Sequence, residues 1–177
     1  PGGWIFLHSI TFNYPLEPTN EDKIIYRNFF KSLSDILPCK YCKESYKIYF
    51  KYLPIDSFLD SRIGVCYWLY RIHNLINDKI FSKNTSLEST IRKYEDIRAK
   101  CGKMSKNGNL DKVYKTCKLE NNKINLIYLS NFINESEKYK IIFDKLLDKM
   151  YKSEENPNKE CLKNNINRVK IIYTVII

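Results

Sequence analysis

Residues 38–79 read PCKYCKESYKIYFKYLPIDSFLDSRIGVCYWLYRIHNLINDK, and this stretch decides the fold. A helix is predicted from about Cys39 to Tyr52, because apolar side chains recur in it at helical spacing. A turn containing Pro54 then leads to a longer helix over residues 57–80. Two amphipathic helices joined by so short a turn predict neighbours in a helical bundle.

Further helices are predicted on both sides of this stretch. The segment 4–12 has helical spacing, and LEPTNEDKIIYRNFFKSLSDILP (residues 16–38) predicts a helix capped by Thr19 or Asn20. The buried stripe predicted for that helix is Ile25, Phe29, Leu33 and Ile36. Residues 86–100 predict a shorter fifth helix. The fold class expected for residues 1–100 is therefore all-α, a four-helix bundle with a short fifth helix.

The character of the sequence changes after residue 100. Residues 101–117 contain glycine, asparagine and lysine with little apolar content, which predicts a flexible linker. Residues 118–177 predict a second, mainly helical domain of unrecognised fold, and within it residues 169–177 favour a strand. The helical period in this region is carried by Ile127, Phe132, Ile142, Phe143, Leu146, Leu147 and Met150.

Composition excludes several classes of protein. The chain has 177 residues, of which 44% are hydrophobic and 28% charged, so it can form a core. No apolar run approaches the roughly 18 residues that a membrane-spanning helix needs. The formal net charge is +10, but the excess is nearly all lysine. Lysine codons are rich in adenine, so a biased genome explains this charge as well as phosphate binding does, and nucleic-acid binding is not favoured.

The sharpest local signal is the C-x-x-C spacing of Cys39 and Cys42 at the start of a predicted helix. Amides and the dipole at a helix N-terminus favour the thiolate form of the leading cysteine, which suits a redox-active dithiol. Zinc needs about four ligands, and neither a second C-x-x-C nor histidines at metal spacing are present, so no metal site is predicted. An inert structural pair stays open as the alternative.

Aromatic and polar side chains fall on two of the predicted helices. Trp4 and His8 are spaced i, i+4, as are His73 and Asn77, with Asn74 beside them. Taken one at a time, such groups are more often satisfied core residues than ligands for a cofactor. Several of them beside a dithiol fit a planar, hydrogen-bonding heteroaromatic ligand, and a flavin has that chemistry.

In these motifs the chain resembles the Erv/ALR family of sulfhydryl oxidases, which carry FAD in a small helical bundle. The likeness extends from Trp4 to Cys101 and includes WIFLH, YPLEP, PCKYC, WLYRIHNLIND and IRKYED in that order. It implies that Cys39 exchanges with substrate and that Cys42 passes electrons to FAD. It also implies that FAD is contacted by Trp4, His8, Tyr14, Cys42, His73, Asn74, Asn77, Lys79 and Tyr94.

The implied function is FAD-dependent oxidation of protein dithiols to disulfides, with O2 as electron acceptor and H2O2 as product, by a homodimer. Cys101 and Cys117 bracket the linker and are predicted to form a disulfide that either shuttles electrons or clamps the junction; Cys66 and Cys161 stay unassigned. Large DNA viruses carry divergent members with extra regions, and such an origin would place the protein in the host cytoplasm or the virion. The competing function is a redox-inactive helical binding or scaffold module whose C-x-x-C is a structural staple.

Overall fold

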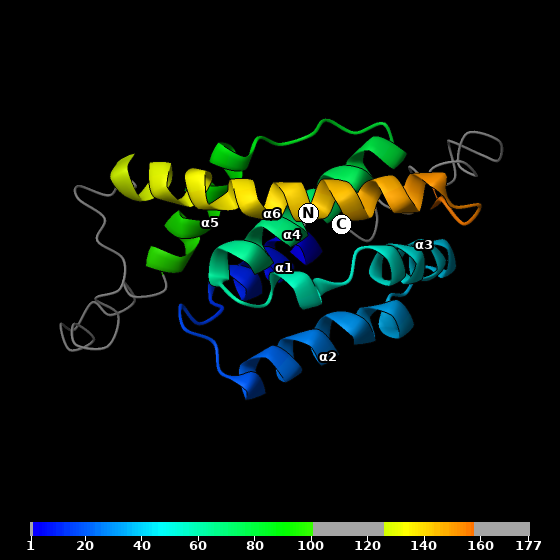
Figure 1. Cartoon of the computed structure of the whole chain (residues 1–177), viewed down its shortest axis with the longest axis horizontal. Helices are drawn as coiled ribbons and strands as arrows, with labels where there is room; N and C mark the ends of the chain where they lie inside the picture. Colours follow the sequence, from blue (N-terminus) through cyan, green and yellow to red (C-terminus); the bar gives the residue numbers. More distant parts are fainter. Residues whose placement is uncertain (1, 101–125, 158–177) are drawn as a thin grey trace.

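The structure is a computed structural model that describes residues 2–100 and 126–157 (Figure 1). Its elements are α1 (Gly2–Phe12), α2 (Asn20–Ile36), α3 (Lys40–Tyr52), the 3-10 helix η1 (Ile55–Phe58), α4 (Arg62–Lys79), α5 (Leu87–Lys100) and α6 (Leu126–Lys152). Within the two described ranges there is no strand, and the all-α prediction is confirmed. None of the described helices is long and apolar enough to cross a membrane.

The ends of the helices follow from capping side chains. Thr19 caps α2: its hydroxyl accepts the Asp22 amide at 3.1 Å, and its own amide donates to the Asp22 carboxylate at 2.9 Å. The prediction that the fourth helix begins at residue 57 is wrong. The Ser61 hydroxyl accepts the Gly64 amide at 3.1 Å, so α4 begins after Ser61 and the preceding residues form η1.

Helix α4 is central, with α1, α5, α6 and η1 packed against it, while α2 packs on α3 (Figure 1). Trp68 of α4 is fully buried, and its indole N–H donates to the Leu53 carbonyl at 2.8 Å. The Phe30 ring of α2 meets the Trp68 ring edge-on at 5.1 Å between centroids. These contacts form one core that joins α2, α3 and α4.

The stripe predicted for α2 is correct at its centre and wrong at its ends. Leu33 is buried and Phe29 is half-buried, but Ile25 and Ile36 are 54% and 65% exposed. Phe30, which was not predicted, is fully buried instead. The helix is therefore rotated so that the Phe30 side faces the core, because that side meets Trp68.

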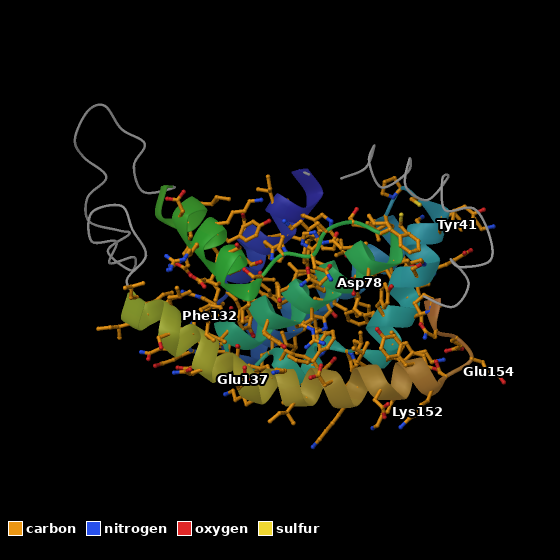
Figure 2. The ribbon with its side chains drawn as sticks, turned by 90° about the horizontal axis from the view of Figure 1, so that it is seen from above. Tyr41, Asp78, Phe132, Glu137, Lys152 and Glu154 are labelled. Carbon is orange, nitrogen blue, oxygen red and sulfur yellow. The ribbon has the colours of Figure 1, made fainter. Side chains whose placement is uncertain are left out.

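Helix α6 runs across the molecule from α5 to α3, with Phe132 near its α5 end and Lys152 near its α3 end (Figure 2). Its predicted helical period is confirmed at Phe143 and Met150, which are fully buried in the core that includes α4. Ile127, also in the predicted set, is 71% exposed.

Gly64 allows α4 to approach its neighbours closely. A Cβ at this position would lie 2.3 Å from the Phe58 carbonyl oxygen and 2.8 Å from ring carbons of Tyr139. The Tyr139 hydroxyl also pairs with the Ser61 hydroxyl at 2.7 Å, so α6 contacts the N-terminal cap of α4. The absence of a side chain at Gly64 is thus what lets η1 and α6 meet α4 here.

The predicted division of the chain into a bundle, a linker and a second domain stays a prediction. Residues 101–125 and 158–177 lie outside the described residues, and with them the linker and the predicted strand at 169–177. The described part of the C-terminal region, α6, shares the core of the bundle.

Candidate active site

The two cysteines of the C-x-x-C motif stand at the start of α3. Cys39 is the N-cap residue, and its sulfur accepts the Cys42 amide at 3.3 Å. Cys39 is a free thiol, and both cysteines are 6% exposed. An N-cap sulfur that accepts a backbone amide lies where the helix N-terminus favours negative charge, which suits a sulfur that must leave as a thiolate in disulfide exchange.

Cys42 faces an apolar cavity of about 120 Å³, and Cys39 is not part of its wall. The wall is drawn from α1, α2, α3 and α4: Gly3, Trp4, Leu7, Leu33, Leu37, Cys42, Ser45, Tyr46, Tyr49, Leu69, Ile72 and Ile76. Of the two motif cysteines, only Cys42 contributes to the wall of this cavity.

Four rings from three helices form a stacked cluster, which we call the ring cluster: Trp4, His8, His73 and Tyr94. Trp4 stacks on His73 with 3.8 Å between centroids, and His8 stacks on Tyr94 at 4.4 Å. The ring nitrogens His8 Nε2 and His73 Nδ1 are 3.1 Å apart and share a hydrogen bond. Since Trp4 also lines the cavity, the ring cluster adjoins it.

Both histidines of the ring cluster are neutral near pH 7. Burial, followed by the charges of His73 and Lys93, lowers the pKa of His8 to about 3. Burial, followed by the charge of Lys93, lowers the pKa of His73 to about 4. His8 is 1% exposed, and its Nδ1 atom has no hydrogen-bond partner among the described residues. A buried nitrogen without a partner is costly, so a bound polar ligand would satisfy it.

Lys79, at the end of α4, brings a positive charge to the same region. Its ammonium donates at 2.5 Å to the hydroxyl of Ser45, which lies one helical turn after Cys42. Ser45 lines the cavity, so the charge lies at its edge. A cation here would favour an anionic group on a bound ligand.

The two predicted amides hold a segment of the chain. Asn74 donates to the Thr85 carbonyl at 3.0 Å and accepts the Thr85 amide at 3.2 Å. Asn77 donates to the Lys83 carbonyl at 3.3 Å. They thus secure the connection between α4 and α5, and a ligand contact for either stays a prediction.

Tyr14 lies apart from the cavity wall. Its hydroxyl donates to the Leu59 carbonyl at 2.8 Å, and burial raises its pKa to about 12.

The four cysteines outside the motif are not part of the cavity wall as the structure describes it. Cys66 is buried beside Phe12, burial raises its pKa, and Cys101, Cys117 and Cys161 lie outside the described residues.

Of the cavity wall only Trp4 and Cys42 were predicted as site residues, and Ser45, Tyr46 and Tyr49 of α3 are among those missed. They follow Cys42 at i+3, i+4 and i+7, which places all four on one face of α3. The spacing counted from Cys42 was thus the signal that could have found them.

The fold and the site define a class of small helical-bundle proteins with a buried C-x-x-C pair beside an apolar, aromatic-rimmed cavity. A sequence model of the Erv1/Alr family matches residues 1–96, and the chain belongs to this family.

Comparison with individual proteins agrees with this family membership. The chain is 40% identical over 76 residues to a probable FAD-linked sulfhydryl oxidase of Acanthamoeba polyphaga mimivirus, covering 42% of this chain and 53% of that protein. It is 30% identical over 77 residues to the mitochondrial FAD-linked sulfhydryl oxidase erv1 of Schizosaccharomyces pombe, covering 44% and 42%. The chain thus spans about half the length of these relatives. A crystal structure of an Erv1 mutant from Saccharomyces cerevisiae superposes with a TM-score of 0.51 at 24% identity, covering 54% of this chain and 79% of that one, which supports the fold.

Proposed function

We propose that the protein is an FAD-dependent sulfhydryl oxidase that forms disulfides in protein dithiols. Electrons pass from the Cys39–Cys42 pair to FAD and then to O2, giving H2O2. The observation that carries the proposal is the place of Cys42 on the wall of an apolar cavity that adjoins the ring cluster. The names of the viral and fungal relatives agree with it.

The described residues fit a flavin. The apolar cavity offers a surface for a flat ring system, and the ring cluster offers stacking faces for the adenine. The Nδ1 atom of His8, which has no partner among the described residues, could form a hydrogen bond with the ligand. The ammonium of Lys79 would attract an anionic group of the ligand. Tyr94 would contact the adenine, together with His8 and His73.

The two cysteines carry out the thiol exchange. A substrate thiolate attacks the sulfur of Cys39 in the Cys39–Cys42 disulfide, which forms a mixed disulfide and releases Cys42 as a thiolate. A second substrate thiolate then attacks the substrate sulfur of the mixed disulfide and releases Cys39. The products are a substrate disulfide and the reduced pair, so two electrons have moved to the protein. The chemistry that bound FAD supplies is acceptance of these two electrons and their delivery to O2.

Replacing Cys42 tests this assignment directly. The Cys42→Ser protein should keep its yellow absorbance near about 450 nm but should lose oxygen uptake with a dithiol, because the sulfur on the cavity wall is gone. The control is Cys66→Ala, which removes a buried thiol outside the site and should oxidise dithiols normally. A Cys42→Ser protein that still consumed oxygen would contradict the electron path. A folded wild-type protein without bound flavin would favour the scaffold alternative.

The protein is further proposed to act as a homodimer through α1 and α2. Phe6 is 59% exposed and meets the half-buried Phe29 at 6.4 Å between ring centroids, while Ile25 beside them is 54% exposed. An exposed apolar face shared by two helices is typical of a subunit interface. Light scattering of the purified chain should give a dimer, and Phe6→Asp should give a monomer. A wild-type monomer at high concentration would refute this part of the proposal.

A further inference from the structure

Helix α6 lies beyond the region that the Erv1/Alr family model matches, and yet it contacts the site through α5. The match ends at residue 96, whereas α6 begins at Leu126. Helix α5 provides Tyr94, which stacks on His8 in the ring cluster. Whatever holds α5 in place therefore helps to set the geometry of that cluster.

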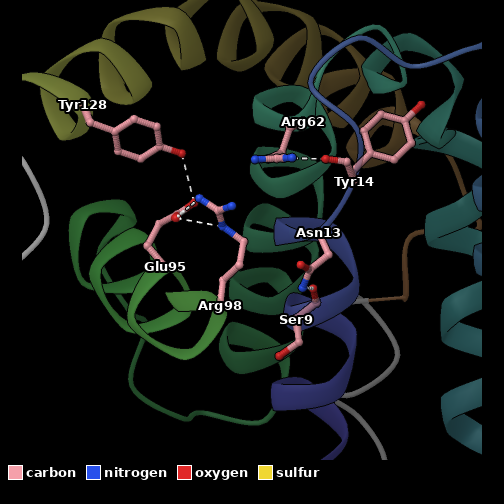
Figure 3. Close-up of polar contacts among 7 residues, drawn as sticks. All are labelled: Ser9, Asn13, Tyr14, Arg62, Glu95, Arg98 and Tyr128. Carbon is pink, nitrogen blue, oxygen red and sulfur yellow. Dashed lines mark hydrogen bonds and ion pairs between the residues drawn. The ribbon is translucent and has the colours of Figure 1, made fainter. Parts of the chain in front are cut away.

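A network of hydrogen bonds and an ion pair around the buried Glu95 joins the two helices (Figure 3). The Tyr128 hydroxyl of α6 donates to Glu95 Oε1 at 2.9 Å, and Arg98 donates to Glu95 Oε2 at 2.6 Å. Glu95 is only 3% exposed, so its carboxylate needs hydrogen-bond donors, and Tyr128 and Arg98 supply two of them. Burial, followed by the charge of Glu95, raises the pKa of Tyr128, so its hydroxyl keeps the proton that it donates.

An aromatic contact runs beside this network. Phe132 of α6 is 1% exposed and stacks on Phe12 of α1 at 6.0 Å between ring centroids. The Phe12 ring in turn meets Tyr94 at 5.6 Å, and Tyr94 stacks on His8. A continuous series of ring contacts thus runs from α6 to the ring cluster.

Helix α5 packs against α1 and α4 as well as α6, and its short length makes it dependent on such packing. It has 14 residues, a length at which an isolated helix is marginal in water, and it follows an exposed segment over residues 81–86. Its buried apolar residues, Ile91 and Tyr94, belong to the same core cluster as Phe132.

We propose that α6 braces α5 and thereby retains the cofactor, with Tyr128 and Phe132 as positioning residues. The bracing follows from the contacts, and the effect on cofactor rests on the proposed function. Neither residue lines the cavity. Both act by keeping Tyr94 stacked on His8.

The test compares two matched variants of the full chain. Tyr128→Phe removes the hydroxyl that α6 donates to Glu95. Tyr139→Phe removes another hydroxyl of α6, the one paired with Ser61 at the start of α4, and leaves the contacts with α5 unchanged. Flavin release from the loaded protein is measured by the recovery of flavin fluorescence after dilution. Hydrogen exchange of the α5 amides is measured on the same proteins, and thermal midpoints show how far each variant is destabilised.

Tyr128→Phe should release flavin roughly tenfold faster than wild type, which is the effect of losing one hydrogen bond to a buried charge. Its α5 amides should exchange faster, while Tyr139→Phe should match wild type in both measurements. Equal flavin release and equal α5 exchange in the two variants would overturn the proposal. If the wild-type chain bound no flavin, the proposed function would fail, and α5 exchange alone would decide whether α6 braces α5.

Discussion

Acidification should destabilise this protein through its two histidines. The chain contains only two, His8 and His73, and both lie in the ring cluster. Their pKa values in the folded protein are about 3 and about 4, against 6.5 for an exposed histidine. Between pH 6.5 and the folded pKa values, the unfolded chain therefore binds two protons that the folded protein does not bind. Stability is complete above pH 6.5 and is lost as the pH falls toward the folded pKa values.

The magnitude follows from the linkage relation. At about pH 5 each histidine destabilises the fold by about 2 kcal/mol, so the pair lowers the free energy of unfolding by about 4 kcal/mol between about pH 7 and about pH 5. Carboxylates whose pKa is lowered in the folded protein contribute little in this interval. Hydrogen bonds from Thr19 hold the pKa of the exposed Asp22 below its ordinary value of 3.8, and those from Lys51 and Tyr52 hold the pKa of Glu155 below 4.5.

Urea denaturation followed by circular dichroism at several pH values measures this loss. His73→Gln removes one titrating group, so its stability should fall by about half as much over the same interval. The reasoning is refuted if the wild-type free energy of unfolding is the same at both pH values. It is equally refuted if His73→Gln loses as much stability as wild type, because the histidines would then not be the cause.

Three further predictions concern the scaffold and the cysteines outside the motif. Gly64→Ala should lower the free energy of unfolding by about 2 kcal/mol, because overpacking against η1 and α6 outweighs the better helix propensity of alanine. The control is Gly2→Ala, where no atom lies within 4 Å of the new Cβ, and it should be neutral in the same denaturation assay. Phe81 has a φ of 56° and is 59% exposed, so Phe81→Gly should raise stability by about 1 kcal/mol in thermal unfolding, and a lower midpoint would contradict this. If Cys101 and Cys117 form a shuttle, their double serine variant should oxidise protein dithiols more slowly but small dithiols normally. If they form a clamp, only its thermal midpoint should fall, and a variant unchanged in both respects would exclude both roles.

The local parts of this protein could be predicted from the sequence because they depend on short-range geometry. Thr19 and the proline after α2 mark helix ends wherever they occur, and the period of 3.6 residues reveals the helices. The same period puts His8 on the face of Trp4, so half of the ring cluster could be anticipated from spacing alone. Cys39 at a helix start is likewise a local fact.

Which face of a helix is buried was decided only by tertiary packing. The sequence period was compatible with a buried Ile25, but in the structure Phe30 is buried instead, because its ring packs against Trp68 of α4. The stacking of Tyr94 on His8 joins α5 to α1, and the hydrogen bond from Tyr128 to Glu95 joins α6 to α5. A sequence period specifies which side chains share a face. The partner that buries that face is chosen by the shape and charge of other helices, which no local pattern contains.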